Sequence, residues 1–254
     1  MKEITIAAAV LATALALAGC SSTGQAVTVG NAPKTTKTAA PLEQGSKKVL
    51  TTAQATAALP TLAQVGPSWV VGDSSANTGG TASHQMTYTP ASCSFSAKDG
   101  GVSDLAIVPS TVTPVVAVKG DFQAAQPADG TAGMSPRSLS VSVKSYKDDI
   151  DPKRLDQIAA RLSKCTTFSS TVSGSGFTAK WNLTPVSLPN YGDGTLAFRM
   201  QATLSILVIL IDSVQIVAGH NIVTITQSGL GKSDPELAGN VAKFVMANLD
   251  TATK

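Results

Sequence analysis

Cys20 is the residue with the clearest chemistry, because it closes an apolar run in the pattern of lipoprotein processing. Residues 4–18 carry no charge, and Lys2 precedes them. A run of about 15 residues is shorter than the roughly 20 needed to span a bilayer. We predict that residues 1–19 are a signal peptide that is removed at Cys20. The Cys20 thiol would take a diacylglyceryl group and the freed amine a further acyl chain such as palmitate, which together anchor a protein stably. The alternative is an ordinary signal peptide with an incidental cysteine.

Cys93 and Cys165 are the remaining cysteines. In an exported protein, a single remaining pair is expected to form a disulfide. The bond would close a loop of about 73 residues and stabilise the domain by roughly 4 kcal/mol in the chain-entropy model. Two buried free thiols are the alternative. No metal is predicted, because only His84 and His220 could join the thiols and neither lies at ligand spacing.

Other patterns that could carry catalysis are weak in this sequence. Residues 229–233 (Gly-Leu-Gly-Lys-Ser) resemble the end of a phosphate-binding loop, but Thr226 stands where the pattern needs a glycine. Residues 174–176 (Gly-Ser-Gly) lack the spacing of a nucleophile elbow. Both segments are predicted to be turns. A serine–histidine–acid triad would depend on His84 or His220, which we expect to be solvated surface residues able at most to sense pH.

The acidic cluster Asp148, Asp149 and Asp151 is predicted to compensate a helix dipole, because a calcium site needs more oxygen ligands at regular spacing. Trp69 and Trp181 are expected in the core, with the lining of a cleft as the alternative. The sequence therefore predicts no catalytic residues, no cofactor and no metal, and it leaves the ligand-binding residues unknown.

Composition and charge set the organisation of the chain. The net charge of the 254 residues is +3 and dispersed, which argues against nucleic acid as a partner. Aromatic residues make up 4%, so the core must be aliphatic. Residues 20–48 hold few large apolar side chains and are predicted to be an acylated flexible tether, whose threonines are candidates for O-glycosylation. Residues 49–254 are long enough for one domain.

Hydrophobic periodicity and capping residues predict an α+β domain. The third helix should begin at Asp151-Pro152 and carry Cys165 to the core, and the last should begin with a capping box at Ser233. A hairpin is expected at residues 219–221. The expected helices are 53–59, 61–65, 151–165 and from 233; the expected strands are 69–71, 114–122, 138–146, 166–172, 177–184, 194–204, 207–218 and 221–227.

The aliphatic run of residues 206–211 is the most apolar part of the domain. A transmembrane span is excluded by its length and by Asp212. We predict a central strand that is buried on both faces. The alternative is the lipid-facing wall of a pocket.

Three segments resemble the extracellular sensor-like domains of actinobacterial serine/threonine kinases and the lipoproteins related to them. These are residues 50–62, residues 88–93 with a Pro-x-x-Cys, and residues 192–223, beginning Gly-Asp-Gly-Thr-Leu-Ala. The resemblance covers most of residues 49–250. It implies an α+β fold, with an antiparallel sheet flanked by helices around a cleft. It also implies a second disulfide, for which this chain lacks the cysteines.

The resemblance favours a binding module. We expect a non-catalytic, extracytoplasmic domain that is held at the cell membrane by its lipid and binds a lipid or glycan ligand or an envelope protein. Two other classes stay open. One is an accessory lipoprotein that braces a membrane complex without a small ligand. The other is a cell-wall hydrolase, which would need facing carboxylates or a serine within reach of a histidine.

Overall fold

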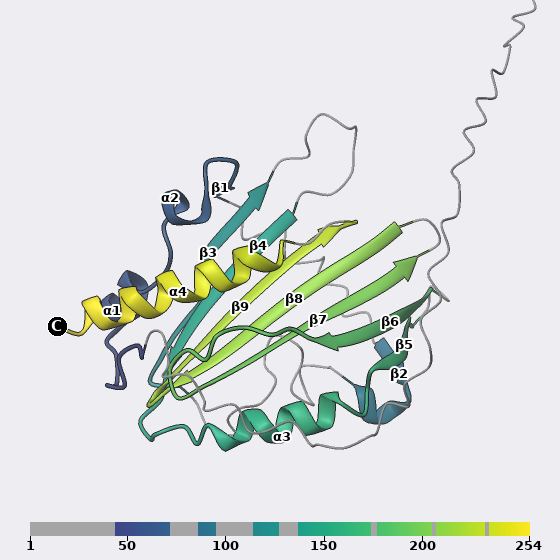
Figure 1. Ribbon diagram of the computed structural model, residues 1–254, viewed down its shortest axis with the longest axis horizontal. Helices are drawn as coiled ribbons and strands as arrows, with labels where there is room; N and C mark the ends of the chain where they lie inside the picture. The colour runs from purple at the N-terminus through teal and green to yellow at the C-terminus, as the bar shows by residue number, and fades with distance from the viewer. Residues whose placement is uncertain are drawn as a thin grey trace, which may run out of the picture. The chain divides into compact units, whose positions relative to one another are not determined.

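An antiparallel sheet organises the folded part of the chain (Figure 1). The structure is a computed structural model, and it describes residues 44–71, 86–94, 114–126, 137–173, 177–204, 207–231 and 234–254. The sheet has nine strands in the order β1-β3-β4-β9-β8-β7-β6-β5-β2. The fold class is therefore α+β, as the sequence predicts.

The elements follow the predicted order along the chain. The strands are β1 (Val70–Val71), β2 (Met86–Thr89), β3 (Val116–Gln126), β4 (Arg137–Ser145), β5 (Thr167–Val172), β6 (Thr178–Pro185), β7 (Gly194–Leu204), β8 (Leu207–Ala218) and β9 (Asn221–Leu230). The helices are α1 (Thr52–Ala57), α2 (Leu62–Val65), the short 3-10 helix η2 (Ala91–Cys93), α3 (Lys153–Leu162) and α4 (Pro235–Ala252).

The sequence prediction misses one strand and ends two others too early; one of these, β9, is predicted as 221–227 and continues to Leu230. β2 was not expected, and β3 continues to Gln126 although residues 124–126 look like part of a loop. Both strands form through pairing with distant segments: β2 pairs with β5, and Ala125 of β3 lies between Val70 of β1 and Ser138 of β4. Such long-range pairing overrides weak local strand propensity.

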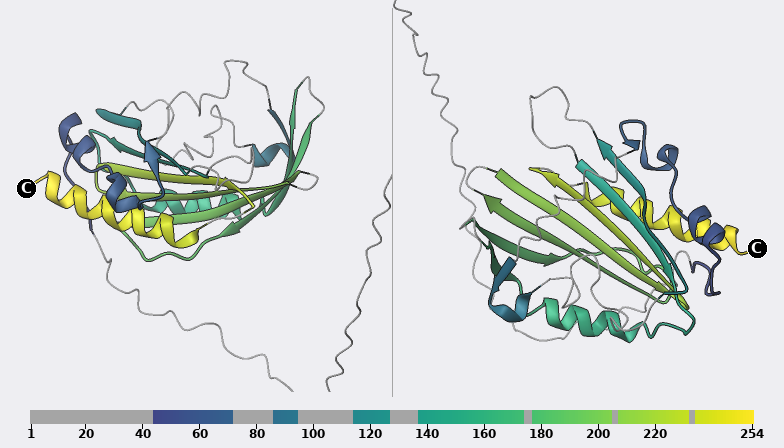
Figure 2. Two further views of the ribbon diagram at one scale, coloured as in Figure 1. Left: turned by 90° about the horizontal axis from the view of Figure 1, so that it is seen from above. Right: turned by 180° about the vertical axis from the view of Figure 1, so that it is seen from behind.

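One face of the sheet, the α4 face, is covered by α4 and α1 (Figure 2). Alternate residues of β4, β8 and β9 point to this side because successive side chains of a strand point to opposite faces. They pack with the apolar stripe of α4 in a core without charged members. The main members from the strands are Leu139, Val141, Val143, Val214, Ile216, Val223 and Ile225, and those from α4 are Leu237, Val241, Val245, Met246 and Leu249.

The opposite face, the α3 face, has its own apolar cluster. Leu155, Ile158 and Leu162 of α3 pack with Phe198 and Met200 of β7. The Cys93–Cys165 disulfide lies at the edge of this cluster and joins η2 to the end of α3, with Cα atoms 5.6 Å apart. The bond thus fastens the β2–η2 segment to α3, which lies far from it in sequence.

The helix starts depend on side-chain caps. Thr51 and Thr61 each form a capping box, with Gln54 and Gln64 respectively. The prediction for the last helix was wrong by one position: Asp234, not Ser233, is its N-cap and accepts the N–H groups of residues 236 and 237. A carboxylate suits this position because it also interacts favourably with the helix dipole.

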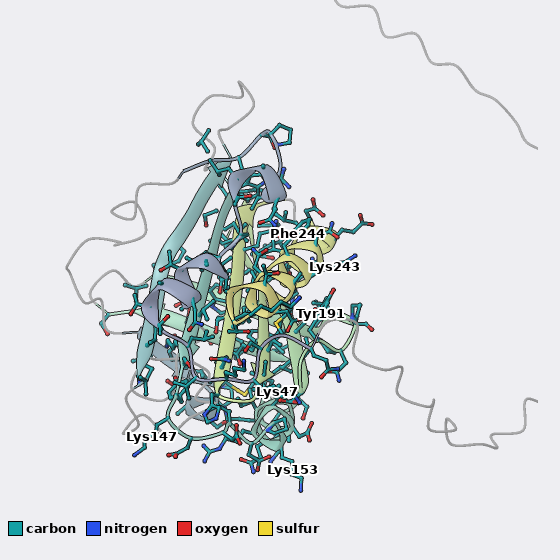
Figure 3. All side chains as sticks on the ribbon, turned by 90° about the vertical axis from the view of Figure 1, so that its left-hand side faces the viewer. Lys47, Lys147, Lys153, Tyr191, Lys243 and Phe244 are labelled. Carbon is teal, nitrogen blue, oxygen red and sulfur yellow. A yellow bond between two sulfur atoms is a disulfide. The ribbon has the colours of Figure 1, made fainter. Side chains whose placement is uncertain are left out.

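Residues 45–48, here called the strap, pack against the domain, although the sequence assigns them to the flexible tether. The Asn221 side chain donates hydrogen bonds from Nδ2 to the carbonyls of Ser46 (2.7 Å) and Lys48 (3.0 Å). Lys47 forms an ion pair with Asp193, whose other oxygen accepts the Gly219 N–H at 2.8 Å. Lys47 lies at the same end of the molecule as Lys147 and Lys153 (Figure 3). The strap therefore attaches the root of the tether beside the β8–β9 turn.

Replacing Asn221, whose side chain binds the strap, should loosen the strap. We expect Asn221→Ala to lower the free energy of unfolding by about 2 kcal/mol, because it removes two hydrogen bonds and leaves their carbonyls without a donor. Asn182→Ala, at an exposed position of β6, is the matched control and should change it by less than about 0.5 kcal/mol. Urea denaturation of both variants measures the difference; equal midpoints would contradict the role of Asn221.

Residues 208–211 are the part of the aliphatic run 206–211 whose burial the structure describes, and they are not buried on both faces as predicted. They are half-buried, whereas residues 212–218 are buried. The buried β8 members of the core under α4 begin only at Val214, and Ile211 packs against the α3 cluster. Residues 208–211 therefore keep some exposed surface.

Candidate functional site

A polar patch interrupts the α3 face in the middle of the sheet. β4, β9 and β8 are adjacent, and in the middle of these strands the residues on this face are hydroxyl or amide side chains. The register places Ser142 beside Thr224 and Thr224 beside Gln215, and in the next row Ser140 beside Thr226 and Thr226 beside Ser213. We call this patch the polar floor, and its members are Ser138, Ser140, Ser142, Ser213, Gln215, Thr224, Thr226 and Ser228.

The innermost side chains of the polar floor lack hydrogen-bond partners. Ser213 is 0% and Gln215 1% exposed, yet Ser213 Oγ and Gln215 Oε1 have no partner. A buried unsatisfied polar atom costs about 1–3 kcal/mol, and native proteins keep few of them. Such atoms at the centre of a hydroxyl-rich patch are suited to accept or donate hydrogen bonds to a ligand.

The surrounding side chains of the polar floor are partly exposed. Ser138, Ser140, Ser142, Thr226 and Ser228 are half-buried. Ser138 and Ser228 share a 2.6 Å hydrogen bond between their hydroxyls. A ligand lying on the sheet would meet this outer ring of hydroxyls before it reached Ser213.

An aromatic cluster lies at the other end of the same face, on β2, β5 and β6. The Phe168 ring stacks on Trp181 with centroids 6.1 Å apart, and Tyr88 lies 6.2 Å from Phe168. Trp181 donates its indole N–H to Ser170 Oγ at 2.8 Å. Burial raises the pKa of Tyr88, so its phenol stays protonated at neutral pH.

The strongest charged interaction lies on the α4 face. Arg199 of β7 donates from Nε and Nη2 to the two oxygens of Asp212 on β8, at 2.6 and 3.0 Å. The hydrogen bond that Arg199 donates to Asp212 raises the pKa of Arg199 and outweighs the opposing effect of burial. Beside Asp212 is a cavity of about 10 Å³ lined by Val186, Leu188 and Ala238, which has space for about one water and no larger ligand. This region is a structural ion pair rather than a ligand site.

His220 was expected to be solvated, but it is half-buried at the β8–β9 turn. Its Nδ1 lies 3.1 Å from the Tyr146 carbonyl and its Nε2 3.2 Å from an Asp149 oxygen. These partners join the turn to the loop before α3. Of the other two acids of the cluster, Asp148 is exposed and Asp151 accepts the Lys153 N–H at the start of α3. The imidazole is far along β8 and β9 from the polar floor serines at 138 and 213, so the structure does not assemble a triad from them.

The structure describes some of the other candidate residues, and the rest lie outside the described ranges. Trp69 is buried in the core under α4, and Trp181 belongs to the aromatic cluster. Gly229 and Leu230 end β9, and Gly231 turns with a φ of +71°. Cys20, His84, residues 174–176, Lys232 and Ser233 lie outside the described residues.

Within the described ranges, no group of three or more histidine, cysteine, aspartate or glutamate side chains could hold a metal ion. Among the same residues, no helix has the length and apolar character to cross a membrane.

The sequence carried part of the signal for the polar floor, and the alternation over residues 138–146 predicts one of its strands. Serines alternate with apolar residues over 138–143, and hydroxyl side chains alternate over 224–228. Each pattern predicts a half-buried strand with one polar face. Their adjacency on a helix-bearing face could not be read from either segment alone.

Comparison with solved structures finds a domain with a similar fold. The extracellular domain of PknH from Mycobacterium tuberculosis matches with a TM-score of 0.56 at 13% identity, over 81% of this chain and 100% of that chain. An uncharacterised protein from Mycobacterium smegmatis, the Rv0999 ortholog, matches with a TM-score of 0.41 at 15% identity, over 74% of this chain and 96% of that chain. No family model and no curated protein sequence matches. The chain therefore shares the fold of an extracellular domain of mycobacterial origin.

Proposed function

We propose that this chain is a cell-envelope lipoprotein, anchored through Cys20, whose domain is a non-catalytic, extracytoplasmic, sensor-like module that binds its ligand on the polar floor. The observation that carries the proposal is the pair of buried, unpartnered polar atoms at the centre of the floor, Ser213 Oγ and Gln215 Oε1. Their desolvation cost is offset when a ligand supplies the missing hydrogen bonds.

The chemistry of the polar floor supports binding rather than reaction. Serine, threonine and glutamine side chains exchange hydrogen bonds without a change of charge at neutral pH. General acid–base chemistry uses groups that titrate near the working pH, and the floor as defined contains none. The likeness of the fold to the extracellular domain of PknH supports the same proposal.

The membrane attachment rests on the sequence at residues 17–20 and on the strap. A lipid on Cys20 would hold the chain at the membrane, and the residues between Cys20 and the strap would tether the domain on the extracytoplasmic side. Mass spectrometry of the N-terminal peptide tests this part: a diacylglyceryl adduct on Cys20 supports it, and an unmodified cysteine contradicts it.

The binding proposal is tested on the full-length chain, expressed with its signal in an actinobacterial host and analysed by native mass spectrometry. We expect a reproducible bound mass that Thr226→Val reduces at least about fivefold, since the substitution keeps the shape and removes one hydrogen bond. Thr184→Val, exposed on the α4 face, is the matched control and should retain the ligand. Equal retention in both variants, or no bound mass in the unsubstituted chain, contradicts the proposal.

Ser213→Ala separates ligand binding from stability. Because Ser213 Oγ has no partner, its removal should raise the free energy of unfolding of the ligand-free domain by about 1 kcal/mol while it weakens ligand retention. Denaturation of the ligand-free chain checks the first effect and native mass spectrometry the second. A loss of stability would mean that the hydroxyl serves the fold.

A further inference from the structure

The α3 face joins the polar floor to a partly exposed apolar strip. In the row beyond the floor, Leu230 of β9 lies beside Ile209 of β8, Ile209 beside Ala202 of β7, and Ala202 beside Trp181 of β6. Leu230, Ile209 and Trp181 are half-buried, whereas Ala202 is 0% exposed. We call Leu230, Ile209, Ala202 and Trp181 the apolar strip. It crosses four adjacent strands and is about 14 Å long at the usual strand spacing.

The strip and the floor are continuous. Along β8, Ser213 of the floor is followed on the same face by Ile211 and then by Ile209 of the strip; along β9, Ser228 is followed by Leu230. Residues of one face repeat at about 6.8 Å along a strand. A single small amphiphile could therefore lie on both areas at once.

Because the floor carries no charge, it favours uncharged polar head groups over charged ones. Its hydroxyls and amide can pair with the hydroxyls of a sugar, each as donor or acceptor. Among the described residues of β4, β8 and β9 on this face, the cation is Lys144, which lies one row beyond Ser142, at the end of the floor away from the strip, and already has a partner in the structure. A charged head group placed over Ser213 would lose its hydration without a counter-charge from the floor, which is costly.

Resting on the proposed function, we infer that the ligand is a glycolipid, with its uncharged sugar on the polar floor and its alkyl chain on the apolar strip. The sugar supplies partners to Ser213 Oγ and Gln215 Oε1. The alkyl chain covers Leu230 and Ile209 and extends toward the Trp181 ring. This assignment also accounts for the partial exposure of Ile209 and Leu230.

Octyl β-glucoside, at concentrations below its micelle threshold, is the probe. The full-length chain is held in phosphatidylcholine nanodiscs, with empty nanodiscs as the blank, and Trp181 emission is followed in a Trp69→Phe background and in the unsubstituted chain. We expect saturable binding that is at least about tenfold tighter than that of glucose or octyl phosphocholine. Hexyl β-glucoside should bind about tenfold more weakly than the octyl compound, because each buried methylene contributes about 0.8 kcal/mol.

Two variants test whether the sugar binds the polar floor and the alkyl chain binds the apolar strip. Thr226→Val should lower the affinity for octyl glucoside about fivefold and leave the ratio of the octyl to the hexyl glucoside affinity unchanged. Ile209→Thr should reduce that ratio to about threefold or less, while Thr184→Val changes neither value. A glucoside that binds no better than the phosphocholine, or a ratio that Ile209→Thr leaves intact, overturns the inference.

The native-ligand and glucoside experiments together distinguish a failure of this inference from a failure of the proposed function. If the native ligand is lost from Thr226→Val but alkyl glucosides do not bind, the class of ligand is wrong and the binding function stands. If Thr226→Val retains the native ligand and glucosides do not bind, both fail.

Discussion

Reduction of the Cys93–Cys165 disulfide is expected to lower the free energy of unfolding by about 4 kcal/mol. The bond closes a long loop, with a sequence separation of 72 residues, and its loss returns that loop's conformational freedom to the unfolded chain. It also releases the β2–η2 segment from the end of α3. For a domain of this size, the melting temperature should fall by roughly 8–16 °C, measured by circular dichroism with and without a reductant.

The control for the disulfide is the double variant Cys93→Ala/Cys165→Ala. It should melt near the temperature of the reduced protein and show no further change with reductant. Because both cysteines are buried, at 2% and 3% exposed, thiol titration must establish complete reduction of the unsubstituted protein. An unchanged melting temperature in fully reduced protein would contradict the expected contribution.

Breaking the Arg199–Asp212 ion pair should have an effect of similar size. Asp212 is 6% exposed and Arg199 28% exposed, so Asp212→Asn leaves a largely desolvated guanidinium opposite a neutral amide. Removal of one partner of a buried pair costs about 3–5 kcal/mol; the partial exposure of Arg199 favours the lower end of this range. Chemical denaturation of the variant measures the loss.

The matched control replaces both charges with apolar side chains. Arg199→Met/Asp212→Leu leaves no uncompensated charge between β7 and β8, and it should recover most of the stability lost in Asp212→Asn. A double variant as unstable as Asp212→Asn would show that the pair contributes by packing rather than by charge. Neither substitution touches the polar floor, which lies on the other face, so ligand retention should persist in the folded protein.

These two interactions differ in how far the sequence could reveal them. A disulfide follows from the count of cysteines in an exported chain. The ion pair requires the register of the β7–β8 hairpin, in which Arg199 faces Asp212. Since Asp212 was noted only as an obstacle to a membrane span, sequence reasoning missed its partner.

Long elements with strong periodicity were predicted closely. The predicted strands 194–204 and 207–218 have the bounds of β7 and β8. β2, with four residues, was missed because its strand conformation depends on pairing with β5. The strap was placed in the tether because residues 20–48 hold few large apolar side chains, whereas the contacts that hold it come from Asn221 and Asp193, far along the chain.

The sequence by itself determined the α+β class, the order of most elements, the pairing of the cysteines and the prediction of a lipid anchor, because these follow from local periodicity, capping residues and composition. Only the tertiary structure decided where the polar faces meet. β9 lies between β4 and β8, and this long-range pairing brings the serines of β4 to the threonines of β9 and to Ser213 and Gln215 of β8. Strand order depends on the burial of whole sheet faces against α4 and α3, and no local segment encodes it.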